Sequence, residues 1–385
     1  MFRWRDAWRR WRNQRLSDPA FRERAMASWW GRRAARRSAA RLFDVVAGFV
    51  YSQVLSACVE LDLFERLRGG PVAAERLAAE TGLDPAAMQR LLGAGVAIGL
   101  FEPTSDGRLA LGPLGAPLVG NAAVLALVRH HGAFYADLAE PLALLRRAPG
   151  GGRVAAQWPY AGHAQPQALD GASVSAYTEL MAASQPLVAQ LLLDSHPFER
   201  AQRLLDVGGG SGRFLMAAAR RAPGLELHLF DLPAVVARAA PALAAAGLAD
   251  RVRLHGGDFL RDPLPQGMDT ATLVRVLHDH DDPEALALLR RVHAALAPGG
   301  VLLVAEPMAG TAGAAGMADA YLDLYLWAMG QGATRSAARI GELLAAAGFE
   351  AVRECPTALP LQARVLRAHK AGLSNNRSEV GVKTS

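Results

Sequence analysis

The chain has 385 residues, of which 51% are hydrophobic and 20% charged, a composition typical of a core-forming protein long enough for two domains with extensions. Its two cysteines, Cys58 and Cys355, exclude a disulfide framework and a cysteine zinc site, and they favour a reducing cytoplasm. No uninterrupted apolar run reaches the roughly 18 residues of a membrane span. The first residues also lack the apolar core of a signal peptide, so we expect a soluble or surface-bound protein.

The first 41 residues form a basic arm. They hold 13 arginines against three acidic residues, a net charge of +10 where the whole chain carries +6, and five of the seven tryptophans. Trp4, Trp8 and Trp11 fall on one face of a helix, beside arginines. This pattern suits the headgroup region of an anionic membrane, so we expect residues 1–41 to dock on such a surface. Packing on a dimer partner is the alternative, and nucleic acid is not an expected partner.

Residues 42–150 have the pattern of an all-helical winged-helix domain. A long apolar helix is followed by a second helix, a glycine turn and a third helix that Asp84 caps. A polar turn with short strand-like flanks comes next, in the place of a wing. The third helix offers Gln89 and Arg90 but little else that recognises bases, so the pattern favours dimerisation over DNA binding.

The second half alternates strands with helices. Residues 151–172 are rich in glycine and proline and predict a linker, and the polar residues 371–385 predict a disordered tail. Between them, residues 173–370 contain short apolar strands separated by helices. This alternation predicts an α/β fold with a doubly wound, mostly parallel, Rossmann-like sheet and helices on both faces.

The residues that carry chemistry begin with a glycine-rich turn between a strand and a helix, residues 204–212. Gly208 and Gly210 allow a sharp turn and let a ligand approach without Cβ atoms in the way. Asp231 ends the next strand, 23 residues after Gly208, and Leu232 follows it. A carboxylate there can accept hydrogen bonds from both ribose hydroxyls of a nucleoside, which still fits a nicotinamide dinucleotide.

The third strand of this series distinguishes the cofactors. It ends in Gly257, Asp258 and Phe259, and an acid with an aromatic ring suits the amino group and ring face of adenine. Dinucleotide enzymes do not usually present this pair, and the turn has the spacing G-x-G-x-G rather than G-x-G-x-x-G. Because ligands of open α/β sheets bind at the carboxyl ends of the strands, we expect Gly208, Asp231 and Asp258 to line one cleft.

The motifs LLDVGGGSG, FDLP, GDF, VLHDHDD and PGGVLLVAEP occur in this order, and over about residues 42–370 the chain resembles the class I O-methyltransferase family that carries an N-terminal winged-helix dimerisation domain. The resemblance implies S-adenosyl-L-methionine as methyl donor, S-adenosyl-L-homocysteine as product, no metal, and a homodimer. It also implies His278 as general base, Glu306 as the acid that orients it, and cofactor contacts from Arg275 and Ser184. A neutral imidazole near the methyl group suits removal of a hydroxyl proton.

Some positions depart from the family pattern. Ala333 stands where a second flanking acid is expected, His280 where tryptophan is frequent, and Val274 where a lysine contacts the cofactor. The adjacent acids and histidines of residues 278–282 also suggest a metal site. However, neighbouring residues at a strand end point in different directions, and no distant ligands complete a set. The last acids of this segment more simply cap the following helix, so no metal is expected.

An apolar acceptor pocket is expected from two helices. The helix of residues 317–329 carries aromatic and methionine side chains, and the helix of residues 177–194 lies where the family closes over cofactor and acceptor. The predicted pocket residues on these helices and beside the base are Met181, Asp279, Tyr321 and Tyr325. Ordinary core packing is the alternative for the apolar members of this set.

Two longer segments, the apolar helix after the arm and YTELMAASQPLVAQ before the glycine turn, resemble the bacterial carotenoid branch of the family. That branch methylates the tertiary 1-hydroxyl of acyclic carotenoids such as demethylspheroidene and hydroxyneurosporene in photosynthetic bacteria. The resemblance implies a cytoplasmic enzyme with a peripheral place on the inner or photosynthetic membrane, where such an acceptor resides. A tertiary alcohol is a weak acid, so its proton would pass to His278 during methyl transfer.

Two alternatives stay open at this point. On the same scaffold the acceptor would be a phenolic or polyketide natural product. An alternative of another class is a winged-helix regulator that senses a ligand through a degenerate methyltransferase domain. The intact His278, Asp231 and Asp258 argue against the regulator, because a sensor has no need of a base.

Overall fold

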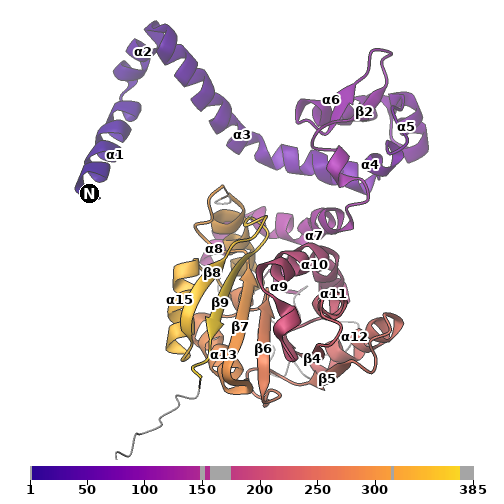
Figure 1. The fold of residues 1–385 in the computed structure, drawn as a ribbon. Helices are drawn as coiled ribbons and strands as arrows, with labels where there is room; N and C mark the ends of the chain where they lie inside the picture. The colour runs from indigo at the N-terminus through magenta and orange to yellow at the C-terminus, as the bar shows by residue number, and fades with distance from the viewer. Residues whose placement is uncertain (1, 148–151, 157–174, 314–315, 373–385) are drawn as a thin grey trace, which may run out of the picture. The chain divides into compact units, whose positions relative to one another are not determined.

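The computed structural model describes residues 2–147, 152–156, 175–313 and 316–372 (Figure 1). The chain divides into two compact units, Met1–Asn121 and Ala122–Ser385. The predicted tail from residue 373 onwards, and the predicted linker apart from residues 152–156, lie outside the described residues.

The arm is helical. Its helices are α1 (Phe2–Ser17), α2 (Pro19–Ala27) and the first part of α3 (Trp29–Glu60), which continues past residue 41 without a break. Asp18 caps α2, because its Oδ1 accepts the N–H of Ala20 at 2.9 Å. Ser28 caps α3 in the same way, accepting the N–H of Gly31 at 3.0 Å. The tryptophans of α1 are exposed, Trp4 to 85% and both Trp8 and Trp11 to 55%, so more than half of each side chain is open to solvent.

Helix α3 corrects one expectation. Within the described part of the chain it is the one helix long and apolar enough to cross a membrane, judged by length and composition alone, and only 11% of its apolar window is buried. Polar residues such as Asp44 and Gln53 interrupt its apolar run without making the helix polar, so no uninterrupted run of this length occurs. Its exposed apolar patch consists of Leu42, Phe43, Val45, Val46, Phe49 and Val50. Helices of dimer interfaces have the same character, so α3 is not assigned as a membrane span.

The rest of the N-terminal unit is a small winged helix. Its elements are α4 (Leu63–Arg66), α5 (Ala74–Thr81), α6 (Pro85–Ala97), β1 (Phe101–Pro103), β2 (Leu109–Leu111) and the 3-10 turn η1 (Ala116–Leu118). Asp84 caps α6 as predicted, accepting the N–H groups of Ala86 and Ala87. Strands β1 and β2 pair antiparallel as the wing, so the described unit is helical except for this hairpin. Phe64 and Phe101 stack at 5.6 Å in its core.

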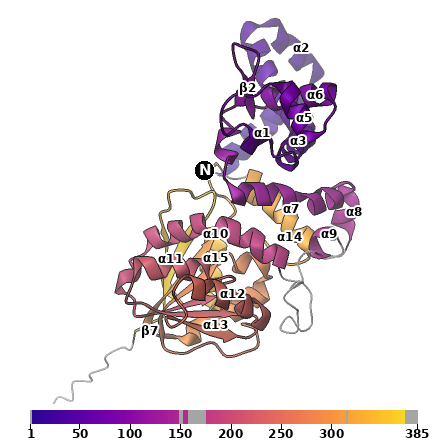
Figure 2. The same cartoon turned by 90° about the vertical axis from the view of Figure 1, so that its right-hand side faces the viewer.

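Several helices at the start of the C-terminal unit precede its sheet. They are α7 (Ala122–Leu138), α8 (Pro141–Arg146), α9 (Arg153–Ala156) and α10 (Ser175–Ser195). Helix α7 contacts α9, α10 and the later helix α14 (Asp323–Met329), as Figure 2 shows. Phe134 and Leu144 are buried together with Leu326 and Met329 in one apolar cluster. Residues 122–147, which the sequence grouped with the winged helix, therefore pack in the C-terminal unit.

A seven-stranded sheet lies at the centre of the described C-terminal unit, in the order β5-β4-β3-β6-β7-β9-β8. The strands are β3 (Arg203–Val207), β4 (Glu226–Asp231), β5 (Val252–Gly256), β6 (Met268–Val274), β7 (Leu296–Glu306), β8 (Glu350–Cys355) and β9 (Arg364–His369). Strands β3 to β7 are parallel, and β9 runs antiparallel between β7 and β8. The predicted mostly parallel sheet is confirmed.

Helices cover both faces of this sheet, as Figure 1 shows. Besides α10, they are α11 (Arg213–Arg221) and α12 (Pro233–Ala245) on one face, and α13 (Asp282–Ala295) and α15 (Ala337–Ala346) on the other. Leu204 of β3 lies in one core with Phe214, whereas the next residue, Leu205, lies in the second core with Leu288. Burial on both sides explains the continuous apolar strands. The parallel direction brings the carboxyl ends of β3 to β7 to one edge.

Candidate active site

The turn between β3 and α11 depends on glycine. Gly208 and Gly210 have φ angles of 69° and 56°, in the left-handed region that favours glycine. A Cβ on Gly208 would lie 2.8 Å from the Val276 side chain, whereas a Cβ on Gly210 would meet nothing within 4 Å. Gly208 therefore lets the turn pack against the end of β6, and Gly210 leaves open space beside the turn.

Asp231, at the end of β4, is hydrogen-bonded to this turn. Its Oδ2 accepts the N–H of Gly210 at 2.8 Å, and its Oδ1 accepts the N–H of Leu232 at 2.7 Å. Burial raises the pKa of Asp231 to about 6, and the two backbone hydrogen bonds oppose the rise. Because a carboxylate has about four lone-pair positions, Asp231 can keep both bonds and still accept from a ribose diol.

Asp206 is a site residue that the sequence analysis missed. It is buried at the end of β3, where Oδ1 accepts the Thr272 hydroxyl at 2.7 Å and Oδ2 has no hydrogen-bond partner among the described residues. Burial raises the pKa of Asp206 to about 7, although the Thr272 hydrogen bond opposes this. A Cβ on Gly209 would lie 2.7 Å from Oδ2, so this carboxyl group lies directly behind the glycine turn. An acidic residue inside an otherwise apolar strand was the sequence signal that could have identified Asp206.

Asp258 follows β5 at the same edge and is buried. Its Oδ1 accepts the N–H of Leu260 at 2.8 Å, and its own N–H donates to Asp262 at 2.8 Å. The half-buried Phe259 meets the ring of His280 edge to face, with 5.3 Å between the ring centroids. His280, in the place where the family often has tryptophan, therefore packs a ring beside Phe259.

Arg275 connects the end of β6 to α10. Its φ of 57° is unusual for a residue with a Cβ, and such strain is common at functional sites. Its Nη2 donates to Oε1 of Gln185 at 2.7 Å. Gln185 was not singled out from the sequence, although it follows Ser184 directly. The side chains of Ser184 and Met181 lie outside the described residues.

His278 lies in the 3-10 turn η4 (Leu277–Asp279) after β6 and is 7% exposed. Its Nε2 is 3.2 Å from Oδ1 of Asp279, and its Nδ1 is 3.7 Å from Oε1 of Glu306. The longer distance is that of an ion pair rather than a hydrogen bond, and Nδ1 has no hydrogen-bond partner among the described residues. Each ring nitrogen therefore faces a carboxyl group.

Glu306, the last residue of β7, also holds the backbone of this turn. Its Oε1 accepts the N–H groups of Val276 at 3.1 Å, Leu277 at 2.5 Å and His278 at 3.3 Å. Hydrogen bonds to an ionised acceptor are stronger than neutral ones. The acid that was predicted to orient the base therefore acts on the backbone that carries it as well as on the ring.

The two carboxyl groups also set the protonation of His278. Burial lowers the pKa of His278, but Asp279 and Glu306 outweigh burial and leave that pKa above the usual value for histidine. Burial raises the pKa of Asp279, against the effect of His278.

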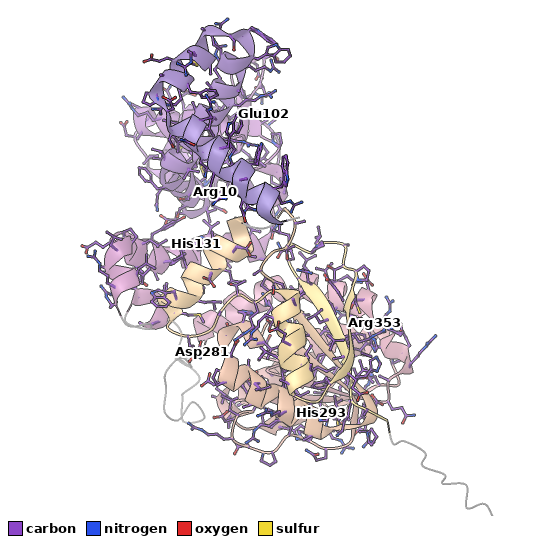
Figure 3. All side chains as sticks on the ribbon, turned by 90° about the vertical axis from the view of Figure 1, so that its left-hand side faces the viewer. Arg10, Glu102, His131, Asp281, His293 and Arg353 are labelled. Carbon is purple, nitrogen blue, oxygen red and sulfur yellow. The ribbon has the colours of Figure 1, made fainter. Side chains whose placement is uncertain are left out.

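An aromatic cluster is formed by α7, the π-helical segment η5 (Gly316–Leu322) and α14. His130 and His131 bond through Nε2 to the hydroxyls of Tyr325 at 2.6 Å and Tyr321 at 2.7 Å. Figure 3 shows His131 on α7. Burial raises the pKa of Tyr325, with smaller effects from Tyr321 and Asp279. The two histidines were missed in the sequence, because their partners lie about 190 residues away.

The structure thus brings the predicted residues Gly208, Asp231, Asp258, Arg275, His278 and Glu306 to the carboxyl ends of neighbouring parallel strands. Open space beside a glycine turn, flanked by acids and an aromatic ring, fits an amino-acid nucleoside such as S-adenosylmethionine. Within the described ranges, no group of three or more histidine, cysteine, aspartate or glutamate side chains could hold a metal ion.

Comparison with known sequences identifies the two domains of the chain. An O-methyltransferase domain matches residues 161–350, and an O-methyltransferase dimerisation domain matches residues 43–120. Demethylspheroidene O-methyltransferase of Cereibacter sphaeroides is 45% identical over 338 residues, which cover 88% of this chain and 88% of that protein. The protein of the same name from Rhodobacter capsulatus is 40% identical over 341 residues, covering 88% of this chain and 84% of that protein.

Solved structures of methyltransferases match most of the chain. Mitomycin 7-O-methyltransferase is 27% identical, with a TM-score of 0.73 over 88% of this chain and 100% of that one. A methyltransferase of calicheamicin biosynthesis, in a form with S-adenosylhomocysteine bound, is 28% identical, with a TM-score of 0.73 over 87% of this chain and 98% of that one. Because domain matches, relatives and fold agree across both units, the chain belongs to the O-methyltransferase family, as a homodimeric enzyme that depends on S-adenosylmethionine.

Proposed function

We propose that this enzyme methylates the tertiary 1-hydroxyl of an acyclic carotenoid such as demethylspheroidene or hydroxyneurosporene, with His278 as the general base. The observation that carries the proposal is the 45% identity to a demethylspheroidene O-methyltransferase across 88% of both chains. The half-buried rings of Tyr321 and Tyr325, packed on a buried apolar cluster, support an apolar acceptor.

The cofactor site lies along the carboxyl edge of the sheet. S-adenosylmethionine supplies the methyl group as an electrophile when it is bound there. Asp231 accepts hydrogen bonds from the ribose, and Asp258 with Phe259 contacts the adenine. The other proposed cofactor contacts are Gly208, Gly210, Leu232, Arg275 and Ser184. Of these, Gly210 supplies the open space and Arg275 connects the site to α10.

His278 takes the proton that the acceptor hydroxyl loses as its oxygen is methylated. A tertiary alcohol is too weak an acid for the imidazole to ionise in advance, so proton transfer accompanies formation of the carbon–oxygen bond. The imidazolium that results is stabilised by Glu306 at 3.7 Å and Asp279 at 3.2 Å. Asp279 lies next to Nε2, so it also contacts the hydroxyl, in a pocket completed by Met181, Tyr321 and Tyr325.

The basic arm docks the enzyme on an anionic membrane, in this proposal the cytoplasmic face of the inner or photosynthetic membrane. Support comes from the +10 net charge of residues 1–41 and from the exposed tryptophans. Arg12 lies over the ring of Trp8 at 5.1 Å, so the charged and aromatic groups share one surface. A surface-docked enzyme can take the hydroxyl end of a polyene from the lipid without extracting the whole chain.

The test is methyl transfer from labelled S-adenosylmethionine to a detergent-dispersed 1-hydroxy carotenoid, beside a panel of simple phenols. Label in the carotenoid is expected. A second candidate acceptor is a phenol, because 3-amino-4-hydroxybenzoate 4-O-methyltransferase of Streptomyces cremeus is 30% identical over 85% of this chain and 89% of that protein. Label in the phenols alone would replace the carotenoid by that acceptor class. The variant His278→Ala should lose turnover while still binding S-adenosylhomocysteine, and near-normal turnover would refute its role as base.

A further inference from the structure

The turn that carries His278 is held on two opposite sides. On one side Glu306 accepts its backbone N–H groups, as described above. On the other side its carbonyl groups accept hydrogen bonds from a single side chain, that of Arg335. Nη1 of Arg335 donates to the Leu277 carbonyl at 2.7 Å, and Nη2 donates to the His280 carbonyl at 2.6 Å. The two carbonyls flank His278 in the chain.

The guanidinium of Arg335 is itself fixed. The residue is 5% exposed, and its Nε donates to Oδ1 of Asp282 at 2.6 Å. Three acceptors from residues 277–282 are therefore bonded by one planar group, with a fork geometry that only arginine provides. A lysine ammonium is a point charge on a flexible stem and cannot span the same three positions at once.

The segment before Arg335 closes over the same turn. Gly332 has a φ of 89°, and a Cβ there would lie 2.1 Å from the carbonyl oxygen of His278. The N–H of Ala333 donates to this oxygen at 3.0 Å, and the N–H of Gly332 donates to Oδ1 of Asp281 at 3.1 Å. Figure 3 marks Asp281 at this place. Every carbonyl from Leu277 to His280 except that of Asp279 thus has a bond to residues 332–335.

We propose that Arg335 is a positioning residue of the methyl-transfer reaction, which holds the turn so that the His278 ring reaches the acceptor hydroxyl. This rests on the proposed role of His278 as base. Arg335 bonds the backbone on both sides of His278 and no bond joins it to the ring, so it acts through the position of that ring. A displacement of about 1 Å in a reacting group can cost about 100-fold in rate.

The chain offers a matched control in Arg339, one helical turn further on. Its Nε and Nη2 donate to Oδ2 of the same Asp282, at 3.1 and 2.6 Å, and its side chain is 48% exposed. Arg339 donates to carboxylates alone in these bonds, to Asp282 and, at 2.6 Å, to Glu342. Removing Arg339 therefore takes away charge and an ion pair at Asp282 but leaves the carbonyls of the catalytic turn bonded.

The experiment compares Arg335→Ala, Arg335→Lys and Arg339→Ala in the full-length enzyme. The readouts are kcat and KM with the 1-hydroxy carotenoid, S-adenosylhomocysteine affinity by calorimetry, and thermal unfolding. We expect Arg335→Ala to lower kcat by about 100-fold, with unchanged S-adenosylhomocysteine affinity, and added guanidinium ions to restore part of the loss. Arg335→Lys should fall between wild type and Arg335→Ala, and Arg339→Ala should keep the wild-type kcat.

A wild-type kcat in Arg335→Ala, or equal losses in Arg335→Ala and Arg339→Ala, would overturn the proposal. So would a loss that guanidinium leaves unchanged in a folded Arg335→Ala protein. If Arg335→Ala does not fold, Arg335→Lys takes its place as the test, and a wild-type kcat in Arg335→Lys overturns the proposal. The variant His278→Ala distinguishes failure of the positioning role from failure of the proposed base. If His278→Ala is inactive and Arg335 variants are normal, only the positioning role fails, whereas an active His278→Ala refutes the base itself.

Discussion

Replacement of Glu306 by glutamine isolates the charge that faces the imidazole. The amide oxygen of Glu306→Gln can still accept the backbone N–H groups of the turn, so the fold should be kept, whereas the negative charge at 3.7 Å from Nδ1 is lost. At an effective dielectric constant of about 20, two unit charges at this distance interact by about 4 kcal/mol. In the proposed mechanism that interaction stabilises the imidazolium of His278, so we expect kcat to fall by about 100-fold to 1,000-fold.

The pH dependence of kcat/KM tests the same charge independently, through the direction in which the acid limb moves. The Glu306 carboxylate is one of the groups that hold the pKa of His278 above its usual value, so its removal lowers that pKa. Only neutral His278 accepts a proton, and kcat/KM falls on the acid side as the imidazole becomes charged. The acid limb should therefore move to lower pH in Glu306→Gln. The assay is methyl transfer with labelled S-adenosylmethionine between pH values of about 5 and 9.

A companion variant separates charge from backbone support. Glu306→Ala leaves the buried N–H groups of the turn without an acceptor, at about 1–3 kcal/mol for each. Urea unfolding should therefore show a clear loss of stability for Glu306→Ala and little for Glu306→Gln. Wild-type kcat and an unmoved acid limb in Glu306→Gln would refute the electrostatic reasoning, whatever the alanine variant does.

Three further outcomes are expected. The pKa of Asp206 rises from 3.8 to about 7 in the folded chain, so burial of its neutral form contributes stability that is complete below pH ~4 and is lost as pH rises to about 7, on the order of 4 kcal/mol. Urea midpoints of Asp206→Asn should decline less over this pH range than those of wild type, because only the part that the raised pKa of Asp231 causes is left, and a decline equal to that of wild type would contradict it. Tyr325→Phe removes the 2.6 Å partner of His130 and should lower stability by about 1–3 kcal/mol and raise the acceptor KM but not that of S-adenosylmethionine. Replacing Trp4, Trp8 and Trp11 by alanine should reduce sedimentation with phosphatidylglycerol vesicles while activity in detergent stays normal, and undiminished sedimentation would contradict the membrane role of the arm.

Strand ends were the most predictable part of the molecule. Gly208, Asp231 and His278 each follow an apolar run, and parallel pairing of β3, β4 and β6 leaves one edge where these ends meet. The sheet and the grouping of these residues at one edge therefore follow from local patterns. Their roles toward cofactor and acceptor remain predictions.

Contacts to the backbone, and contacts between distant segments, leave no pattern in the sequence from which they could be predicted. Arg335 bonds carbonyl oxygens of residues 277 and 280, and any sequence supplies those atoms. His130 meets a tyrosine 195 positions later, because α7 packs on α14. For α3, single polar residues concealed an apolar helix of membrane-spanning length.

The packing of α7 against α14 has a consequence for how acceptor preference can change. The aromatic wall of the proposed pocket comes from two segments, about residues 122–138 and 316–329. In the sequence, these segments lie before and after the strands that carry the proposed cofactor site. A catalytic fragment that began near residue 161, where the family domain match starts, would lack the histidines that bond Tyr321 and Tyr325. Chimeras with relatives of other acceptor preference should therefore exchange both segments together. Exchange of one segment alone would place histidines from one protein against tyrosines from another.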